Sequence, residues 1–252
     1  MRIFITLFFK ELRSLFFSPV AWVVLAVVML INGFSFRAAV ATLEIGPQAS
    51  SIVTLTFFSR WFWLSYFFIF PLLTMRLFAE ERKLGTFETL FTAPVRTWQV
   101  VLAKFSAAIV FYCLLWVPSL GNFHLFQFMT RGAAEIPQGQ ILGTYLLLFF
   151  LGLFNIAAGC LASALTSNQI VAAALSFTFS LMHFLLGVFV LYLGQKVPPA
   201  FTDFVHYFAT VEHIPTFTSG LLDTRPLVYY SSLTVVFLVL THQVLEFRRW
   251  RL

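Results

Sequence analysis

Charge is the property that this sequence has least of. Asp, Glu, Lys and Arg together make up 10% of its 252 residues, whereas a soluble domain typically carries about 25%. Hydrophobic residues make up 60%, and so few charges cannot cover the surface of a water-soluble fold of this length. The shortage therefore excludes an ordinary soluble domain and favours an integral membrane protein.

Cysteine and the familiar catalytic motifs are also scarce. The two cysteines, Cys113 and Cys160, lie in apolar runs, where they are typical of small core residues rather than of a disulfide or a metal site. The sequence contains no G-x-x-x-x-G-K-[ST] phosphate loop, no His-Glu-x-x-His pair and no G-x-S-x-G motif. We therefore expect no catalytic residue, no metal and no cofactor on this chain, which is not an enzyme by itself.

The net charge is +6, and the Lys and Arg residues are distributed unevenly between the two predicted sides of the membrane. No stretch resembles a nucleic-acid-binding patch, so we expect no nucleic acid partner. With both termini on one side of a membrane, that side holds eleven of the sixteen Lys and Arg residues and the other side holds five. Because cytoplasmic loops carry the excess of positive charge, we predict a multi-pass protein of the inner (cytoplasmic) membrane with both termini in the cytoplasm.

Long apolar runs take up most of the chain. A helix that crosses a bilayer needs about 20 mostly apolar residues, and only helices or closed barrels pair every backbone group within lipid. Runs without alternation predict helices, so the fold class is an all-α integral membrane protein with a single transmembrane domain over 1–252. Pro71 should kink the second span. The six expected spans are about 19–39, 57–78, 98–120, 141–165, 170–193 and 227–245.

The segment 2–17 precedes the first span and is amphipathic. Its polar stripe recurs at helical spacing, which is typical of a helix lying in the headgroup plane; a simple lead-in to the first span is the alternative. Ser18 and Pro19 are suited to begin the next helix. The stripe consists of Arg2, Thr6, Lys10 and Arg13.

The charged loop 80–97 joins the second and third spans. Gly85 permits a sharp turn, Thr86 is suited to cap a short helix, and Glu88 suits the helix N-terminus. Pro94 limits that helix to about two turns. Its apolar face would either insert into a groove on a partner or pack onto the membrane interface, and the pattern leaves both open. That face consists of Phe87, Leu90 and Phe91.

Two further groups of polar residues lie outside this loop. The segment 194–226 predicts short amphipathic helices that dip into the outer leaflet, broken by prolines. A metal site among its acids and histidines is conceivable, but a solvated polar face is favoured. Within the spans, Asn155 and His183 are interpreted as hydrogen-bonding contacts between helices rather than as a transport site. The ligand candidates of the outer segment are Asp203, His206, Glu212 and His213.

Residues in and around the charged loop also match a known pattern. They are Pro71-Leu72-Leu73-Thr74-Met75-Arg76, Glu80-Glu81-Arg82, Gly85-Thr86, Glu88, Leu90, Pro94-Val95 and Lys104. With them the chain resembles, over its whole length, the ABC-2 type permeases, which are the transmembrane subunits of ATP-binding-cassette exporters. Lys10-Glu11-Leu12 and Phe17-Ser18-Pro19 are most similar to the branch that contains the gliding-motility-associated permease and the copper-processing permease.

The resemblance implies a particular architecture and particular partners. It implies six spans, an N-terminal interfacial helix, a cytoplasmic coupling helix and an outer helical hairpin before the last span. It also implies a separate ABC ATPase subunit that carries ATP and magnesium, and a dimer with a second permease copy or a homologous permease. Gly85 would be the hinge of the coupling loop. The ATPase-coupling residues would be Glu80, Glu81, Arg82, Gly85, Thr86, Phe87, Glu88, Leu90, Phe91 and Pro94.

The resulting hypothesis is a permease subunit of an ABC transporter, an exporter that moves its substrate with ATP hydrolysed on another chain. The alternative is a stand-alone channel or secondary transporter without an ATPase partner. That alternative needs an ion or proton site within the membrane, yet all ten acids lie in loops or near the ends of spans. An intramembrane enzyme is disfavoured by the missing catalytic motifs.

Overall fold

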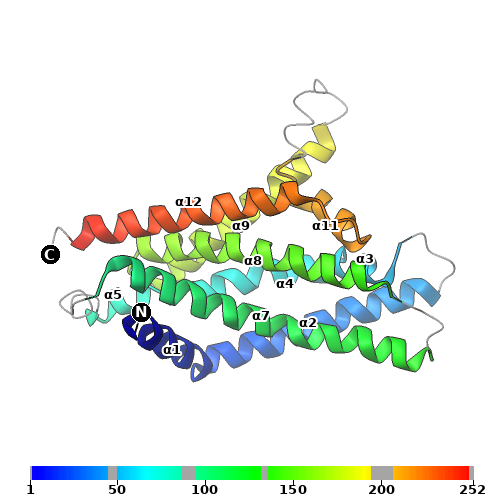
Figure 1. Cartoon of the computed structure of the whole chain (residues 1–252), viewed down its shortest axis with the longest axis horizontal. Helices are drawn as coiled ribbons and strands as arrows, with labels where there is room; N and C mark the ends of the chain where they lie inside the picture. Colours follow the sequence, from blue (N-terminus) through cyan, green and yellow to red (C-terminus); the bar gives the residue numbers. More distant parts are fainter. Residues whose placement is uncertain (1, 45–49, 87–94, 132–135, 194–206, 250–252) are drawn as a thin grey trace.

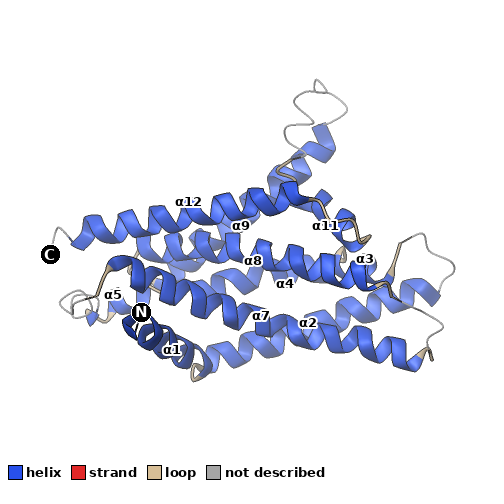
Figure 2. Ribbon diagram, in the orientation of Figure 1, coloured by secondary structure: helices blue, strands red, loops and turns tan. Residues whose placement is uncertain are grey.

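The computed structural model describes residues 2–44, 50–86, 95–131, 136–193 and 207–249. Within these ranges every regular element is a helix, and the long helices run side by side as a bundle (Figures 1 and 2). The helices are α1 (Arg2–Phe16), α2 (Pro19–Glu44), α3 (Ile52–Phe57), α4 (Arg60–Thr74), α5 (Ala79–Lys83), α7 (Thr97–Met129), α8 (Gln138–Leu165), α9 (Gln169–Leu193), α11 (Thr210–Thr218) and α12 (Thr224–Arg249).

Five of the described helices are long and apolar enough to cross a membrane: α2, α7, α8, α9 and α12. They confirm the helices expected at 19–39, 98–120, 141–165, 170–193 and 227–245. The largest difference in bounds is at α7, which continues through Pro118 to Met129. A tight turn over 166–168 joins α8 to α9, and the Asn168 side chain accepts a hydrogen bond from the Ile170 amide at 2.9 Å.

The segment expected as the second span, 57–78, is not one continuous helix. It is divided at Phe58 and Ser59, and the Ser59 hydroxyl caps α4 by accepting a hydrogen bond from the Phe62 amide at 3.2 Å. The 15 residues of α4 extend over about 22 Å at 1.5 Å per residue. The helix includes Pro71 and ends three residues later at Thr74, where a turn leads into α5.

The amphipathic segment at the start of the chain forms α1, as predicted. None of its residues is fully buried, but it packs along α7 through partly buried apolar side chains such as Leu7 and Leu15. The chain turns at Ser18, and α2 begins at Pro19. Figure 1 shows α1 at the same end of the bundle as α5 and the last turns of α12, and we call this the polar end.

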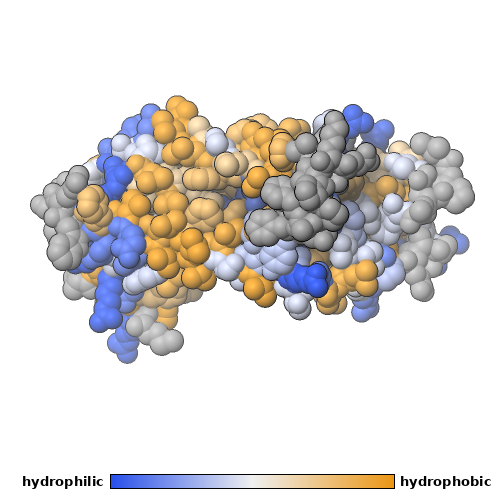
Figure 3. All heavy atoms as spheres, turned by 90° about the horizontal axis from the view of Figure 1, so that it is seen from above, coloured by the Kyte–Doolittle hydropathy of each residue, from blue (hydrophilic) through white to orange (hydrophobic). Residues whose placement is uncertain are grey.

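Side-chain polarity follows this arrangement. On the face shown in Figure 3, hydrophobic residues gather on the half of the bundle nearer the polar end, with hydrophilic residues beyond them at that end and further hydrophilic residues on the other half. At the end opposite to the polar end, α11 packs against α3, α8 and α9. The predicted outer segment 194–226 is described only from residue 207 onward, so residues 194–206, including Asp203 and His206, lie outside the described residues.

Helix α8 is the centre of the bundle and contacts α4, α7, α9, α11 and α12. Small side chains let its neighbours come close, which is the usual basis of helix packing in membranes. At Gly159, a Cβ atom would overlap the buried side chain of Thr74 on α4. The α4–α8 contact therefore depends on the absence of a side chain at this position.

Gly159→Ala should separate α4 from α8 and lower the free energy of unfolding by about 1–3 kcal/mol, the usual cost of overpacking. The matched control is Gly121→Ala on α7, where a Cβ meets no atom within 4 Å and alanine has the higher helix propensity. Thermal unfolding in detergent measures both variants. Equal melting temperatures for the two would contradict the close packing at Gly159.

Candidate functional site at the polar end

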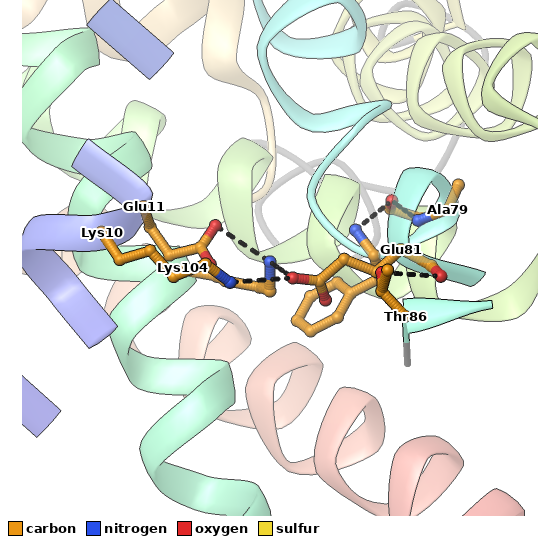
Figure 4. A network of polar contacts seen from close by, with 8 residues as sticks. Lys10, Glu11, Ala79, Glu81, Thr86 and Lys104 are labelled. Carbon is orange, nitrogen blue, oxygen red and sulfur yellow. Dashed lines mark hydrogen bonds and ion pairs between the residues drawn. The ribbon is translucent and has the colours of Figure 1, made fainter. Parts of the chain in front are cut away.

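A lysine lies buried inside the polar end of the bundle. Lys104 lies on α7 and is only 2% exposed. Its Nζ atom lies 2.9 Å from Glu11 Oε2 on α1 and 2.9 Å from Glu81 Oε1 on α5 (Figure 4). A buried ammonium is costly unless it is paired and hydrogen-bonded, so Lys104 holds three elements together.

Lys10 on α1 completes a group of four charges. Its Nζ atom lies 3.5 Å from Glu11 Oε1 and 3.7 Å from Glu81 Oε1, and its side chain is 58% exposed. Two ammonium groups thus face two carboxylates, and the group is neutral as a whole. Because Lys10 is solvated and Lys104 is not, loss of Lys104 should destabilise the folded protein more than loss of Lys10.

The turn before α5 is held by a serine from another helix. Ser163, near the end of α8, accepts hydrogen bonds from the amides of Phe78 and Ala79, each at 3.0 Å. Its hydroxyl also donates to the carbonyl of Met75 at 3.2 Å. The first amides of a helix lack partners within the helix, and here a neighbouring side chain supplies one.

Arg82 adds a second contact between α5 and α8. Its Nη1 atom donates a hydrogen bond to the carbonyl of Ala164 at 3.3 Å. Partial burial, together with the positive charge of Arg248, lowers the pKa of the Arg82 guanidinium from its ordinary value. α5 is therefore fixed to α8 on one side and to α1 and α7 on the other.

Helix α5 ends in a turn that favours glycine. The Leu84 amide donates to the carbonyl of Glu80 at 2.9 Å, and Gly85 follows with a φ of 71°. Residues other than glycine rarely adopt this left-handed backbone conformation. The sharp turn predicted at Gly85 is therefore confirmed. The Thr86 hydroxyl donates back to the carbonyl of Glu81 at 3.3 Å.

The structure describes only half of the predicted coupling residues. Glu81, Arg82, Gly85 and Thr86 take part in the contacts above, and Glu80 accepts the backbone bond that closes α5. The predicted short helix after Thr86 lies outside the described residues and stays a prediction. The same applies to Phe87, Glu88, Leu90, Phe91 and Pro94.

Sequence reasoning did not place Glu11 and Lys104 in one site with Glu81. Glu11 and Lys104 belong only to the residues that resemble the ABC-2 type permeases. A signal was nevertheless present, because an isolated lysine inside an apolar run needs a buried counter-charge. The sequence does not say which of ten acids supplies it.

The last turns of α12 are fastened at the same end. The Thr97 hydroxyl at the start of α7 donates to Glu246 Oε2 at 2.6 Å, and the rings of Trp98 and His242 stack at 4.2 Å between centroids. Arg248 Nη2 donates to the carbonyl of Leu165 at 2.8 Å. The polar end thus joins the ends of α7, α8 and α12 as well as α1 and α5.

Asn155 hydrogen-bonds between helices, as predicted. On α8 it donates to the Tyr66 hydroxyl on α4 at 2.8 Å and accepts from the Ser180 hydroxyl on α9 at 2.8 Å. These contacts confirm its interpretation as a link between helices.

His183 makes the equivalent link nearer the opposite end. It contacts the Tyr229 hydroxyl on α12 at 3.2 Å and the Thr210 hydroxyl on α11 at 3.1 Å. Among the described residues, no group of three His, Cys, Asp or Glu side chains could hold a metal ion.

The sequence profile of the ABC-2 family transporter proteins matches residues 34–231. That range covers more than half of the 252 residues. The chain belongs to the ABC-2 transporter family. It is a multi-pass membrane protein and a permease of the ABC transporter class. No curated protein matches this ABC-2 family chain.

Within this ABC-2 permease the matched range contains two partners of the buried ion pair, Glu81 and Lys104, whereas Lys10 and Glu11 precede it. The site therefore joins the family domain to the helix before it. Glu11 adds an ion pair to the apolar contacts that already hold α1 against α7.

Lys104→Met should lower the free energy of unfolding on the order of 3 kcal/mol, because Glu11 and Glu81 would lose their buried counter-charge. Lys10→Met is the matched control: it removes an exposed ammonium from the same carboxylates and should cost less than about 1 kcal/mol. Chemical denaturation in detergent compares them. Similar small losses for both variants would show that the buried lysine is not the one that stabilises this end.

Proposed function

We propose that this chain is the permease subunit of an ABC exporter, driven by a separate ATPase subunit that binds ATP and magnesium. Two permeases, either two copies or this chain with a homologous one, would form the transmembrane unit. The observation that carries the proposal is the ion pair of Lys104 with Glu11 and Glu81, since it connects the loop after the second predicted span to α1 and α7. Family membership supports the transporter class.

The contacts of α5 favour transmission of force from the loop 80–97. A push on this loop would pass through Glu81 to Lys104 on α7, and through Lys104 to Glu11 on α1. Ser163 would carry the same push to α8. Because α5 is held on both sides, the turn at Gly85 is the natural place for movement between it and the following residues, which we propose to form the coupling helix that meets the ATPase.

The arrangement of the polar end supports an orientation. We propose that this end, with both termini, lies in the cytoplasm and that α1 lies at the membrane interface. The excess of Lys and Arg on this side agrees with the rule for inner-membrane proteins. We propose that α3 and α4 together form one more crossing, which is the second along the chain and brings the total to six. We also propose that 194–226 is an outer re-entrant segment of a single domain over 1–252.

The alternative, a stand-alone channel or secondary transporter, needs an ion or proton site within the bundle. Asn155 and His183 instead have hydrogen-bond partners on neighbouring helices. The residues around Glu11 and Ser18 further favour the branch of gliding-motility-associated and copper-processing permeases. Both residues have contacts at the polar end: Glu11 with Lys104, and Ser18 with Arg76.

Purification of the tagged chain from its native membrane in a mild detergent tests the ATPase partner. We expect a protein with a phosphate-loop motif to co-purify and to hydrolyse ATP, identified by mass spectrometry and by phosphate release. Phe87→Asp should reduce its recovery if the apolar face of the predicted coupling helix docks into it. Recovery of the permease without any such ATPase would favour the channel or secondary-transporter alternative.

Substitutions at Gly85 test the hinge. Gly85→Val places a β-branched side chain at a φ of 71°, which costs roughly 1–2 kcal/mol, and it should reduce ATP hydrolysis by the complex several-fold while the ATPase stays bound. Gly85→Asn should retain more activity, because asparagine tolerates this conformation. If Gly85→Val and Gly85→Asn hydrolyse ATP at the wild-type rate, Gly85 is not the hinge of the coupling loop.

A further inference from the structure

A cavity of about 570 Å³ adjoins the buried ion pair. Residues of α1, α2, α4, α5 and α7 line it, together with the turns that join them. Its volume lies in the range of pockets that bind small molecules, about 300–1,000 Å³. One part of its wall is apolar and the other is charged, which is the division that an amphiphilic ligand requires. The apolar part includes Leu15, Val20, Val24, Leu73 and Phe111.

Two buried atoms of the charged wall have no hydrogen-bond partner in the described part of the chain: Arg76 Nε and Glu81 Oε2. Arg76 does donate from Nη1 to the Ser18 hydroxyl at 3.2 Å. Glu81 pairs with Lys104 through its other oxygen. A buried polar atom without a partner destabilises the folded state, so each of these two atoms is suited to a ligand in the cavity.

The two atoms require opposite chemistry. The guanidinium of Arg76 carries a positive charge and a free N–H donor, and in the described residues no carboxylate forms an ion pair with it. Glu81 Oε2 is a negatively charged acceptor that needs an N–H or O–H donor. A simple anion would satisfy Arg76 but not Glu81, and it would also meet Glu80 on the same wall.

We propose that this cavity binds a zwitterionic aminophospholipid. The phosphodiester accepts hydrogen bonds from Arg76, and the primary ammonium donates to Glu81 Oε2. The acyl chains lie along the apolar wall between α1 and α2. This site shares Glu81 with the ATPase-coupling contacts proposed above, but lipid binding there does not depend on that function.

The surroundings of the cavity favour a lipid over a soluble molecule. Phe17, which lines it between α1 and α2, is 84% exposed, and Leu72 on the α4 side is also exposed. Apolar side chains exposed in this way are stable in contact with hydrocarbon rather than with water. The lipid chains can therefore leave the cavity over an apolar surface, while the head remains near α5.

Lipid retention tests the proposal directly. The full-length protein in a mild non-ionic detergent is incubated with an equimolar mixture of dioleoylphosphatidylethanolamine, dioleoylphosphatidylcholine and dioleoylphosphatidylglycerol, and retained lipid is counted by native mass spectrometry. We expect phosphatidylethanolamine to be retained about tenfold over phosphatidylcholine, because a quaternary ammonium cannot donate the charge-assisted hydrogen bond to Glu81. Soluble O-phosphoethanolamine, at millimolar concentration, should not displace the lipid.

Two variants act on different parts of the site. Arg76→Gln removes the phosphate contact, and Ser14→Trp places a large side chain at an exposed position that lines the cavity; both should lower the retention of phosphatidylethanolamine several-fold. Arg13→Gln, which removes an exposed arginine of the same helix that does not line the cavity, should leave that retention unchanged. Thermal unfolding checks that each variant is folded.

The remaining outcomes overturn the proposal. Equal retention of the three lipids by the wild-type protein would mean that the cavity holds only detergent or water. A preference for phosphatidylglycerol would mean an anion site without an ammonium contact. Displacement by O-phosphoethanolamine would mean that the ligand is soluble, and unchanged retention of phosphatidylethanolamine by both folded variants would place the bound lipid elsewhere. All four readouts are independent of ATP hydrolysis.

Discussion

The polar end of this protein depends on one buried ammonium group. Lys104 lies on an apolar helix where an unpaired charge would not be tolerated. Its two carboxylate partners, Glu11 on α1 and Glu81 on α5, lie far from each other in the sequence. Neither α1 nor α5 has a large buried face of its own: α1 has no fully buried residue and α5 has five residues in all. Their positions are therefore set by electrostatic pairing as much as by apolar packing.

The interior of the bundle is held in another way. α8 contacts most of the other long helices and carries small side chains where the contacts are closest. Single hydrogen bonds, such as that of Asn155 with Tyr66, then fix the rotation of one helix against another. In a membrane, where apolar contact with a helix is no better than contact with lipid, such steric fit and occasional polar bonds supply the specificity.

Most of the long helices could be predicted from the sequence, because the length of an apolar run is a local property. The second span could not, since the break at Ser59 depends on tertiary contacts: the Ser35 hydroxyl on α2 bonds to both the Thr56 carbonyl and Ser59. The charged loop was recognised as the candidate site, and the turn at Gly85 follows from its glycine. Its anchors, Glu11, Lys104 and Ser163, could not be assigned because pairing between distant elements leaves no periodic pattern.

The break before α4 has a consequence for the lipid around the protein. Trp61, Leu64 and Phe68 are exposed on α4, so this helix offers an apolar face to the bilayer. At about 22 Å for 15 residues, that face is shorter than a hydrocarbon layer of about 30 Å. A bilayer thins locally beside an apolar face that is shorter than its hydrocarbon layer, whereas the 26 residues of α2 extend over about 39 Å. The described helices thus present lipid with apolar faces of unequal length around the bundle.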